Sequence, residues 1–253
     1  MYSGIIAVFA FACTFGGALA GMWLRTVLPE HHFSDQTRDT MKLGIGLIAT
    51  MTALILGLVT ASAKSTFDDL DKAVKHAAVD LLVLDRTLAR YGPETTEVRK
   101  ALREAVHQRL ELTWPETSTR PVKLEAPDVT RAAEEVLVQI RGLSPKNEDQ
   151  RWLHSRALTL GEGLLDTRLI IATRLGGSVP VPFLTVLIFW LTIIFTSFGL
   201  FAPRNFTVVA VLFLCTISVA SAIFLILEMG DPFGGVIKIS VDPLRFAYTR
   251  MNQ

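Results

Sequence analysis

What this 253-residue chain most clearly lacks is charge, which is missing from four long stretches. A membrane-spanning helix needs about 20 mostly apolar residues. A single Asp, Lys or Arg at mid-bilayer costs roughly 2.5–3.5 kcal/mol on insertion scales. The sequence therefore predicts a polytopic membrane protein with four transmembrane helices, lying within Met1–Leu24, Leu43–Ala63, Leu175–Pro203 and Asn205–Leu227.

Other absences narrow the function. The two cysteines, Cys13 and Cys215, both fall in apolar stretches, which argues against a disulfide framework or a zinc site. The net charge is only +1 and no basic patch is evident, so nucleic acid is not an expected partner. No Walker, dinucleotide-binding or serine-elbow motif is present. We expect no enzyme activity, no catalytic residues, no metal and no cofactor.

The charged residues gather between the second and third apolar stretches. This segment is long enough for one small helical domain and too short for a separate large enzyme fold. We therefore predict an all-α protein whose extramembrane stalk domain lies between two helix pairs. The expected divisions are residues 1–64 (first transmembrane pair), 65–174 (stalk domain), 175–228 (second pair) and 229–253 (C-terminal tail).

The stalk begins with apolar residues at alternating steps of three and four, which place them on one helical stripe. They are Phe67, Leu70, Val74, Ala77, Leu81, Leu84, Leu88 and Tyr91. No proline interrupts residues 43–91, so the second transmembrane helix and the stalk are expected to form one rod, stopped at Gly92-Pro93. Three further helices are expected near residues 98–106, 128–140 and 147–175. These stripes fit an intramolecular core; an intermolecular coiled coil is the alternative.

The tail carries the only notable strand signal. Val236, Ile237, Ile239 and Val241 are rich in β-branched residues and could form a short extended segment.

The distribution of Lys and Arg predicts the orientation. With four crossings, the termini and the stalk share one side, where eight cationic residues lie near the membrane: Lys64, Lys72, Lys75, Arg168, Arg174, Lys238, Arg245 and Arg250. The other side has four: Arg25, Arg38, Lys42 and Arg204. The excess predicts that the stalk and both termini lie in the cytoplasm.

The second apolar stretch carries a stripe of small and hydroxylated residues that ends in a lysine. Its members recur at steps of four and three: Gly46, Thr50, Ala53, Gly57, Thr60 and Lys64. Small residues let helices approach closely, which is one interpretation. The other is that this polar stripe lines a water-filled path, with Lys42 and Lys64 near its two mouths. We take these seven residues as candidate pore-lining positions.

The first loop holds further candidates. His31 and His32 are adjacent, and Arg38 follows nearby. Neighbouring histidines on a helix point to different faces, and no His-x-x-x-His pair is present. We therefore interpret His31 and His32 as solvated or interfacial side chains rather than as metal ligands.

Several segments together resemble a bacterial family catalogued as bestrophin-like, whose members are of unknown function. The resemblance rests on Leu28-Pro29-Glu30-His31-His32, Gly46-Leu47-Ile48-Ala49-Thr50, Leu56-Gly57-Leu58, Ala61-Ser62-Ala63-Lys64, Leu227-Glu228, Asp231-Pro232-Phe233, Gly235, Ser240 and Pro243-Leu244. It spans nearly the whole chain and implies a multi-pass protein of the bacterial inner (plasma) membrane. Bestrophins are pentameric anion channels with a central pore, so the resemblance implies an oligomeric channel by analogy.

Two functions from different classes are compatible with these observations. One is a homo-oligomeric ion channel, for chloride or another small anion, with the second helix facing the axis. The other is a non-conducting membrane scaffold that uses its stalk for interactions. An intramembrane enzyme is disfavoured because His, Asp and Glu are missing from the apolar stretches.

Overall fold

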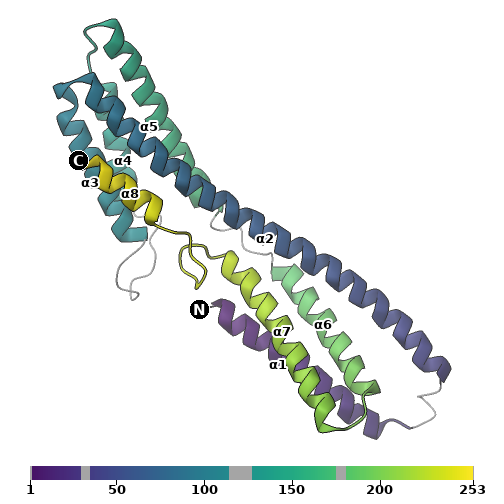
Figure 1. The fold of residues 1–253 in the computed structure, drawn as a ribbon. Coiled ribbons are helices and arrows are strands. Elements are labelled where there is room, and N and C mark those ends of the chain that lie inside the picture. The colour runs from purple at the N-terminus through teal and green to yellow at the C-terminus, as the bar shows by residue number, and fades with distance from the viewer. Residues whose placement is uncertain (1, 30–34, 114–126, 175–180, 253) are drawn as a thin grey trace. The chain divides into compact units, whose positions relative to one another are not determined.

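The computed structural model describes residues 2–29, 35–113, 127–174 and 181–252, and this part of the chain is helical with no strand (Figure 1). The all-α prediction is confirmed. The helices are α1 (Tyr2–Val27), α2 (Asp35–Tyr91), the short 3-10 helix η2 (Pro93–Thr95), α3 (Thr96–Thr113), α4 (Pro127–Arg141), α5 (Glu148–Arg174), α6 (Val181–Phe201), α7 (Phe206–Met229) and α8 (Asp242–Met251).

The chain divides into two compact units. The first, which we call the membrane unit, comprises Met1–Ser65 and Ser178–Gly230. The second, the helical unit, comprises Thr66–Gly177 and Asp231–Gln253. Each unit is therefore built from two segments that are distant in sequence.

Four helices of the described residues are long and apolar enough to cross a membrane: α1, α2, α6 and α7. The prediction of four spans is confirmed. Asn205 caps α7, because its side-chain oxygen accepts a hydrogen bond from the Val208 amide at 2.9 Å. A capping side chain of this kind satisfies one of the amides that the first helical turn leaves without a partner.

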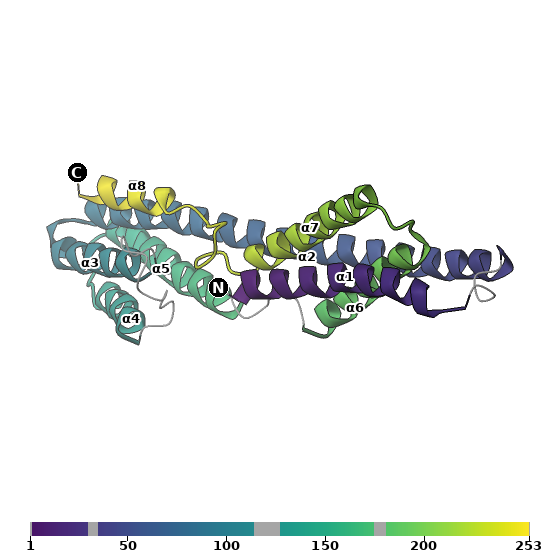
Figure 2. The same cartoon turned by 90° about the horizontal axis from the view of Figure 1, so that it is seen from below.

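The core of the membrane unit lies where α1 packs against α6 and against α7 (Figures 1 and 2). Buried apolar side chains from all three helices form one cluster, including Ala10, Ala18, Leu191, Phe195 and Ile223. Lipid chains are as apolar as these side chains, so close packing between the helices stabilises this core within a bilayer.

Helix α2 is 57 residues long, which confirms the predicted continuous rod. Its membrane half leaves large apolar side chains exposed in the single chain: Leu43, Leu47, Leu54 and Leu58 are each 65–77% accessible. Exposed leucines on a transmembrane helix are suited to contact with lipid or with a neighbouring subunit. Helix α2 ends just before Gly92, whose backbone φ is 139°. Residues other than glycine rarely adopt this conformation.

The helical unit has its own core. The predicted stalk stripe supplies Leu70, Val74, Leu84 and Leu88, which pack in one cluster with residues of α3, α4 and α5. The stripe is therefore part of an intramolecular core.

The tail completes this core. Phe233, Ile239, Ala247 and Met251 are each at most 2% accessible and belong to the same cluster. The tail forms α8, which packs against α3 (Figure 1). The extended segment expected around residues 236–241 contains no strand; instead the Ile239 amide donates a hydrogen bond to the Pro232 carbonyl oxygen at 2.9 Å.

Candidate functional site

The predicted pore-lining residues lie on one exposed face of α2. Lys42, Gly46, Thr50, Ala53, Gly57, Thr60 and Lys64 are all exposed in the single chain. Another side of the helix packs against the rest of the membrane unit: Thr52 is 4% accessible, and Ile55 and Leu56 contact the core cluster. With about 100° of rotation per residue, the exposed stripe lies roughly a third of a turn from that buried side.

The glycines of this stripe are not used for close packing within the chain. A Cβ atom added at Gly46 or Gly57 would meet no other atom within 4 Å. Glycines instead allow the backbones of α1 and α6 to approach each other closely. A Cβ on Gly21 would lie 2.0 Å from the Thr196 carbonyl oxygen, and one on Gly199 would lie 1.9 Å from the Ala18 carbonyl oxygen.

The threonines of the stripe are bonded to their own helix. The Thr50 hydroxyl donates to the Gly46 carbonyl oxygen at 2.8 Å, and the Thr60 hydroxyl donates to the Leu56 carbonyl oxygen at 2.6 Å. Such bonds to the carbonyl four residues earlier keep a hydroxyl compatible with an apolar environment. They leave the oxygen lone pairs on the outside of the helix.

The two lysines lie at the two ends of the stripe. The Lys42 ammonium lies 3.1 Å from an Asp39 carboxylate oxygen, and both side chains are largely exposed. Exposed pairs of this kind contribute little to stability, but Asp39 partly offsets the positive potential at that end of the stripe. Lys64 lies at the other end, near the boundary of the membrane unit.

The structure says little about the three candidate residues predicted in the first loop. His31 and His32 lie outside the described residues, and Arg38 lies in the first turns of α2. Within the described part of the chain, no group of three His, Cys, Asp or Glu side chains could hold a metal ion. Both cysteines are free thiols.

One polar contact in the membrane unit was not foreseen. Glu228, near the end of α7, is only 3% accessible and accepts a hydrogen bond from the Ser3 hydroxyl of α1. A buried carboxylate is costly unless polar groups surround it. This contact therefore links the first turn of α1 to the last turn of α7, and no local pattern in the sequence pairs residues so far apart.

The described architecture is that of a polytopic helical membrane protein whose second helix presents a polar, unpacked face. A family model described as a bestrophin-like domain matches residues 12–244. The chain belongs to this bestrophin-like family, as its sequence motifs suggested.

Solved structures share the fold. One variant of a bacterial bestrophin homologue from Klebsiella pneumoniae is 14% identical, with a TM-score of 0.65, and the match covers 98% of this chain and 99% of that one. A second variant of that homologue is 15% identical, with a TM-score of 0.66, over 97% of this chain and 95% of that one. Among curated proteins, none is significantly similar in sequence.

Proposed function

We propose that this chain is the subunit of a homo-oligomeric membrane channel for chloride or another small anion, with α2 lining an axial path. The observation that carries the proposal is the exposed stripe on α2, whose glycines meet nothing within the chain. Membership of the bestrophin-like family supports it. One four-helix unit is too thin to enclose a hydrated pore, so the path requires several copies around an axis.

The charge of the stripe argues for anions. Oligomerisation would repeat Lys64 around one mouth and Lys42 around the other. Rings of cationic side chains raise the local concentration of anions and lower that of cations.

Flux measurements on protein reconstituted in liposomes test the proposal. Lys64→Glu should shift permeability from chloride toward sodium, and Thr50→Leu should lower conductance by narrowing and drying the path. Met51→Ala is the matched control and should change neither, because Met51 is also exposed, at 44%, and lies roughly 100° around the helix from Thr50. If the unaltered protein passes no ion, with calcium or low pH included among the conditions, the scaffold function replaces this proposal.

We also propose that residues 65–174 and both termini are cytoplasmic, because eight of the twelve cationic residues near the membrane lie on that side. Single cysteines at Glu148 and Asp39 test this orientation in a background with Cys13→Ala and Cys215→Ala. Both reporter side chains are more than 70% accessible. An impermeant maleimide added to intact cells should label position 39 and spare position 148. The opposite pattern would reverse the orientation.

A further inference from the structure

Two arginines join α1 to the connection between α6 and α7. Arg25, in the last turn of α1, donates a hydrogen bond from Nη1 to the carbonyl oxygen of Ala202, which directly follows α6. In the reverse direction, Arg204 donates from Nη2 to the Met22 carbonyl oxygen of α1 at 2.7 Å. Both guanidinium groups therefore lie at one corner of the membrane unit, where α1 ends and the chain passes from α6 to α7 (Figure 1).

Most of the donors of these two side chains are left for another partner. A guanidinium carries five N–H donors, and each of these bonds uses one of them. Among the residues that the structure describes, no acidic side chain forms an ion pair with Arg25 or Arg204. Arg204 is exposed and Arg25 is partly exposed. The corner therefore presents charged donors to its surroundings.

The net charge of this corner is positive. The C-terminal ends of α1 and α6 and the N-terminal end of α7 meet here, and each helix end carries roughly half an elementary charge, negative at a C-terminus and positive at an N-terminus. These ends offset only a part of the two arginine charges, so roughly one and a half positive charges remain. An anion is favoured at such a place, and the planar guanidinium fork matches the oxygens of a phosphate.

The surroundings of the corner are those of the membrane boundary. It lies at the ends of three candidate spans, Ser3–Val27, Val181–Phe201 and Phe206–Met229, and so at the level of the lipid headgroups. Exposed apolar side chains adjoin the arginines in sequence: Leu24 is 37% accessible and Phe206 is 87% accessible. Aromatic residues are enriched at this level of a bilayer. A ligand at this corner therefore meets cationic donors and apolar surface together.

We propose that this corner binds an anionic phospholipid such as phosphatidylglycerol, with the lipid phosphate at Arg25 and Arg204 and the acyl chains along the adjoining apolar surface. Basic sites between transmembrane helices are suited to anionic headgroups. A lipid held in this way would add a link between α1 and the connection from α6 to α7. The acyl chains distinguish this ligand from inorganic phosphate, which has no apolar part to bury.

Mass spectrometry of the intact full-length protein in mild detergent tests the proposal with equimolar phosphatidylglycerol and phosphatidylcholine. Phosphatidylglycerol should be retained about tenfold or more over phosphatidylcholine, whose choline group cancels the phosphate charge. It should stay bound when inorganic phosphate is added at the same concentration. Equal retention of the two lipids would overturn the proposal without any variant being needed. Displacement by the inorganic phosphate would assign the site to free phosphate and overturn the lipid assignment.

Variants test whether the two arginines carry the preference. Arg25→Gln combined with Arg204→Gln keeps amide donors but removes both charges, and the two lipids should then be retained about equally. Lysine at both positions should keep most of the preference, because the charges remain. Arg141→Gln is the matched control and should change nothing, since Arg141 lies in the helical unit, is exposed and pairs with Glu162 at 3.1 Å. A preference that survives the double glutamine variant, shown by thermal unfolding to be folded, would contradict the assignment.

Discussion

Arg99 on α3 donates two hydrogen bonds to the buried carboxylate of Asp85 on α2, from Nε to Oδ1 at 2.8 Å and from Nη2 to Oδ2 at 2.9 Å. The Asp85 side chain is 2% accessible and that of Arg99 is 25% accessible. This bidentate pair ties the first two helices of the helical unit together, and it raises the pKa of Arg99 through the hydrogen bonds to Asp85.

The asymmetry in burial gives the first prediction. Arg99→Met leaves the Asp85 carboxylate buried without its partner, and we expect a loss of about 3–5 kcal/mol in unfolding free energy. Asp85→Leu should cost less, because Arg99 can turn toward water, and the double variant should cost less than Arg99→Met alone. Unfolding of detergent-solubilised protein measures all three. Equal losses for the two single variants would contradict this account.

The second prediction concerns the contact between α1 and α6. A Cβ on Gly199 would lie 1.9 Å from the Ala18 carbonyl oxygen, so Gly199→Ala must push the two backbones apart. We expect a destabilisation of about 1–3 kcal/mol or more, as for other overpacked sites. Gly16→Ala in α1 is the control, because its Cβ would meet nothing within 4 Å. Thermal unfolding of the purified variants should separate the two clearly.

The third prediction concerns pH. The Lys146 ammonium donates to a Glu94 carboxylate oxygen at 2.9 Å and holds the pKa of Glu94 below its usual value, chiefly through that hydrogen bond. A carboxylate with a lowered pKa stabilises the folded state above its ordinary pKa, and this contribution is lost as the pH falls through the folded-state value. Lys146→Met should therefore raise the pKa of Glu94, which carboxyl NMR titration measures.

The same variant should be less stable than the unaltered chain at neutral pH, and the difference should vanish in acid. Lys100→Met removes another lysine of this unit and is the control. A Glu94 titration unchanged by Lys146→Met would show that the contact does not persist in solution.

The fourth prediction separates the two interpretations of the small-residue stripe. If Gly57 faces an axial path, Gly57→Leu should reduce anion flux while the subunit stoichiometry stays the same. If Gly57 instead packs against a neighbouring subunit, the added side chain should dissociate the oligomer. We expect the first result. Light scattering on the purified complex, combined with liposome flux, distinguishes the two outcomes.

Much of the fold could be predicted from residues that are neighbours in the sequence. The length of the uncharged stretches predicted the four spans. Apolar residues spaced three and four apart from Phe67 to Tyr91 predicted the stalk half of α2, and Gly92-Pro93 predicted where it ends. These predictions succeed because bilayer thickness sets the length of a span, the helical period sets the spacing of apolar residues, and glycine and proline end helices.

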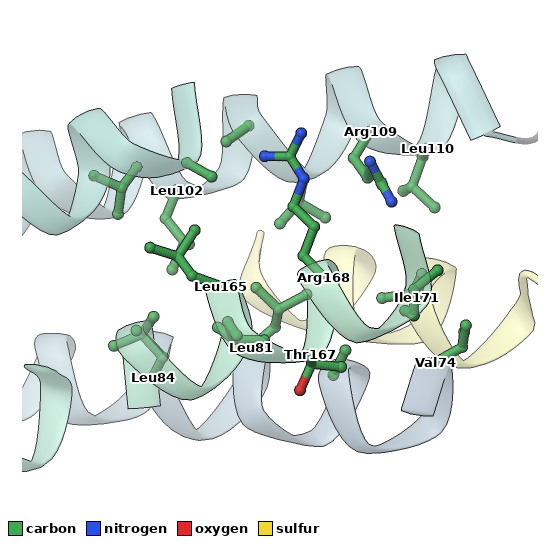
Figure 3. A pocket seen from close by; sticks show the side chains of 18 of the residues that line it. Val74, Leu81, Leu84, Leu102, Arg109, Leu110, Leu165, Thr167, Arg168 and Ile171 are labelled. Carbon is green, nitrogen blue, oxygen red and sulfur yellow. The ribbon is translucent and has the colours of Figure 1, made fainter. Parts of the chain in front are cut away.

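The parts that escaped prediction depend on contacts between distant residues. Gly21 and Gly199 resemble other glycines of apolar helices until α1 and α6 are placed together. Arg109 and Arg168 look like ordinary solvated charges on amphipathic helices, and only the fold places both of them in the wall of one pocket (Figure 3). Helix α8 was missed because it is only ten residues long, and its apolar side chains complete a core that is formed mainly by other helices.

The hydrogen bonds of Thr50 and Thr60 within α2 have a consequence for any ion that passes them. Each hydroxyl has a single proton, and the carbonyl oxygen one turn earlier already receives it. An anion at this depth must compete with the backbone for that proton, whereas water is able to donate to the outward lone pairs. Such threonines would therefore hold an anion loosely and through its hydration shell. Weak, exchangeable binding is what fast conduction requires, since an ion must leave each position as readily as it enters.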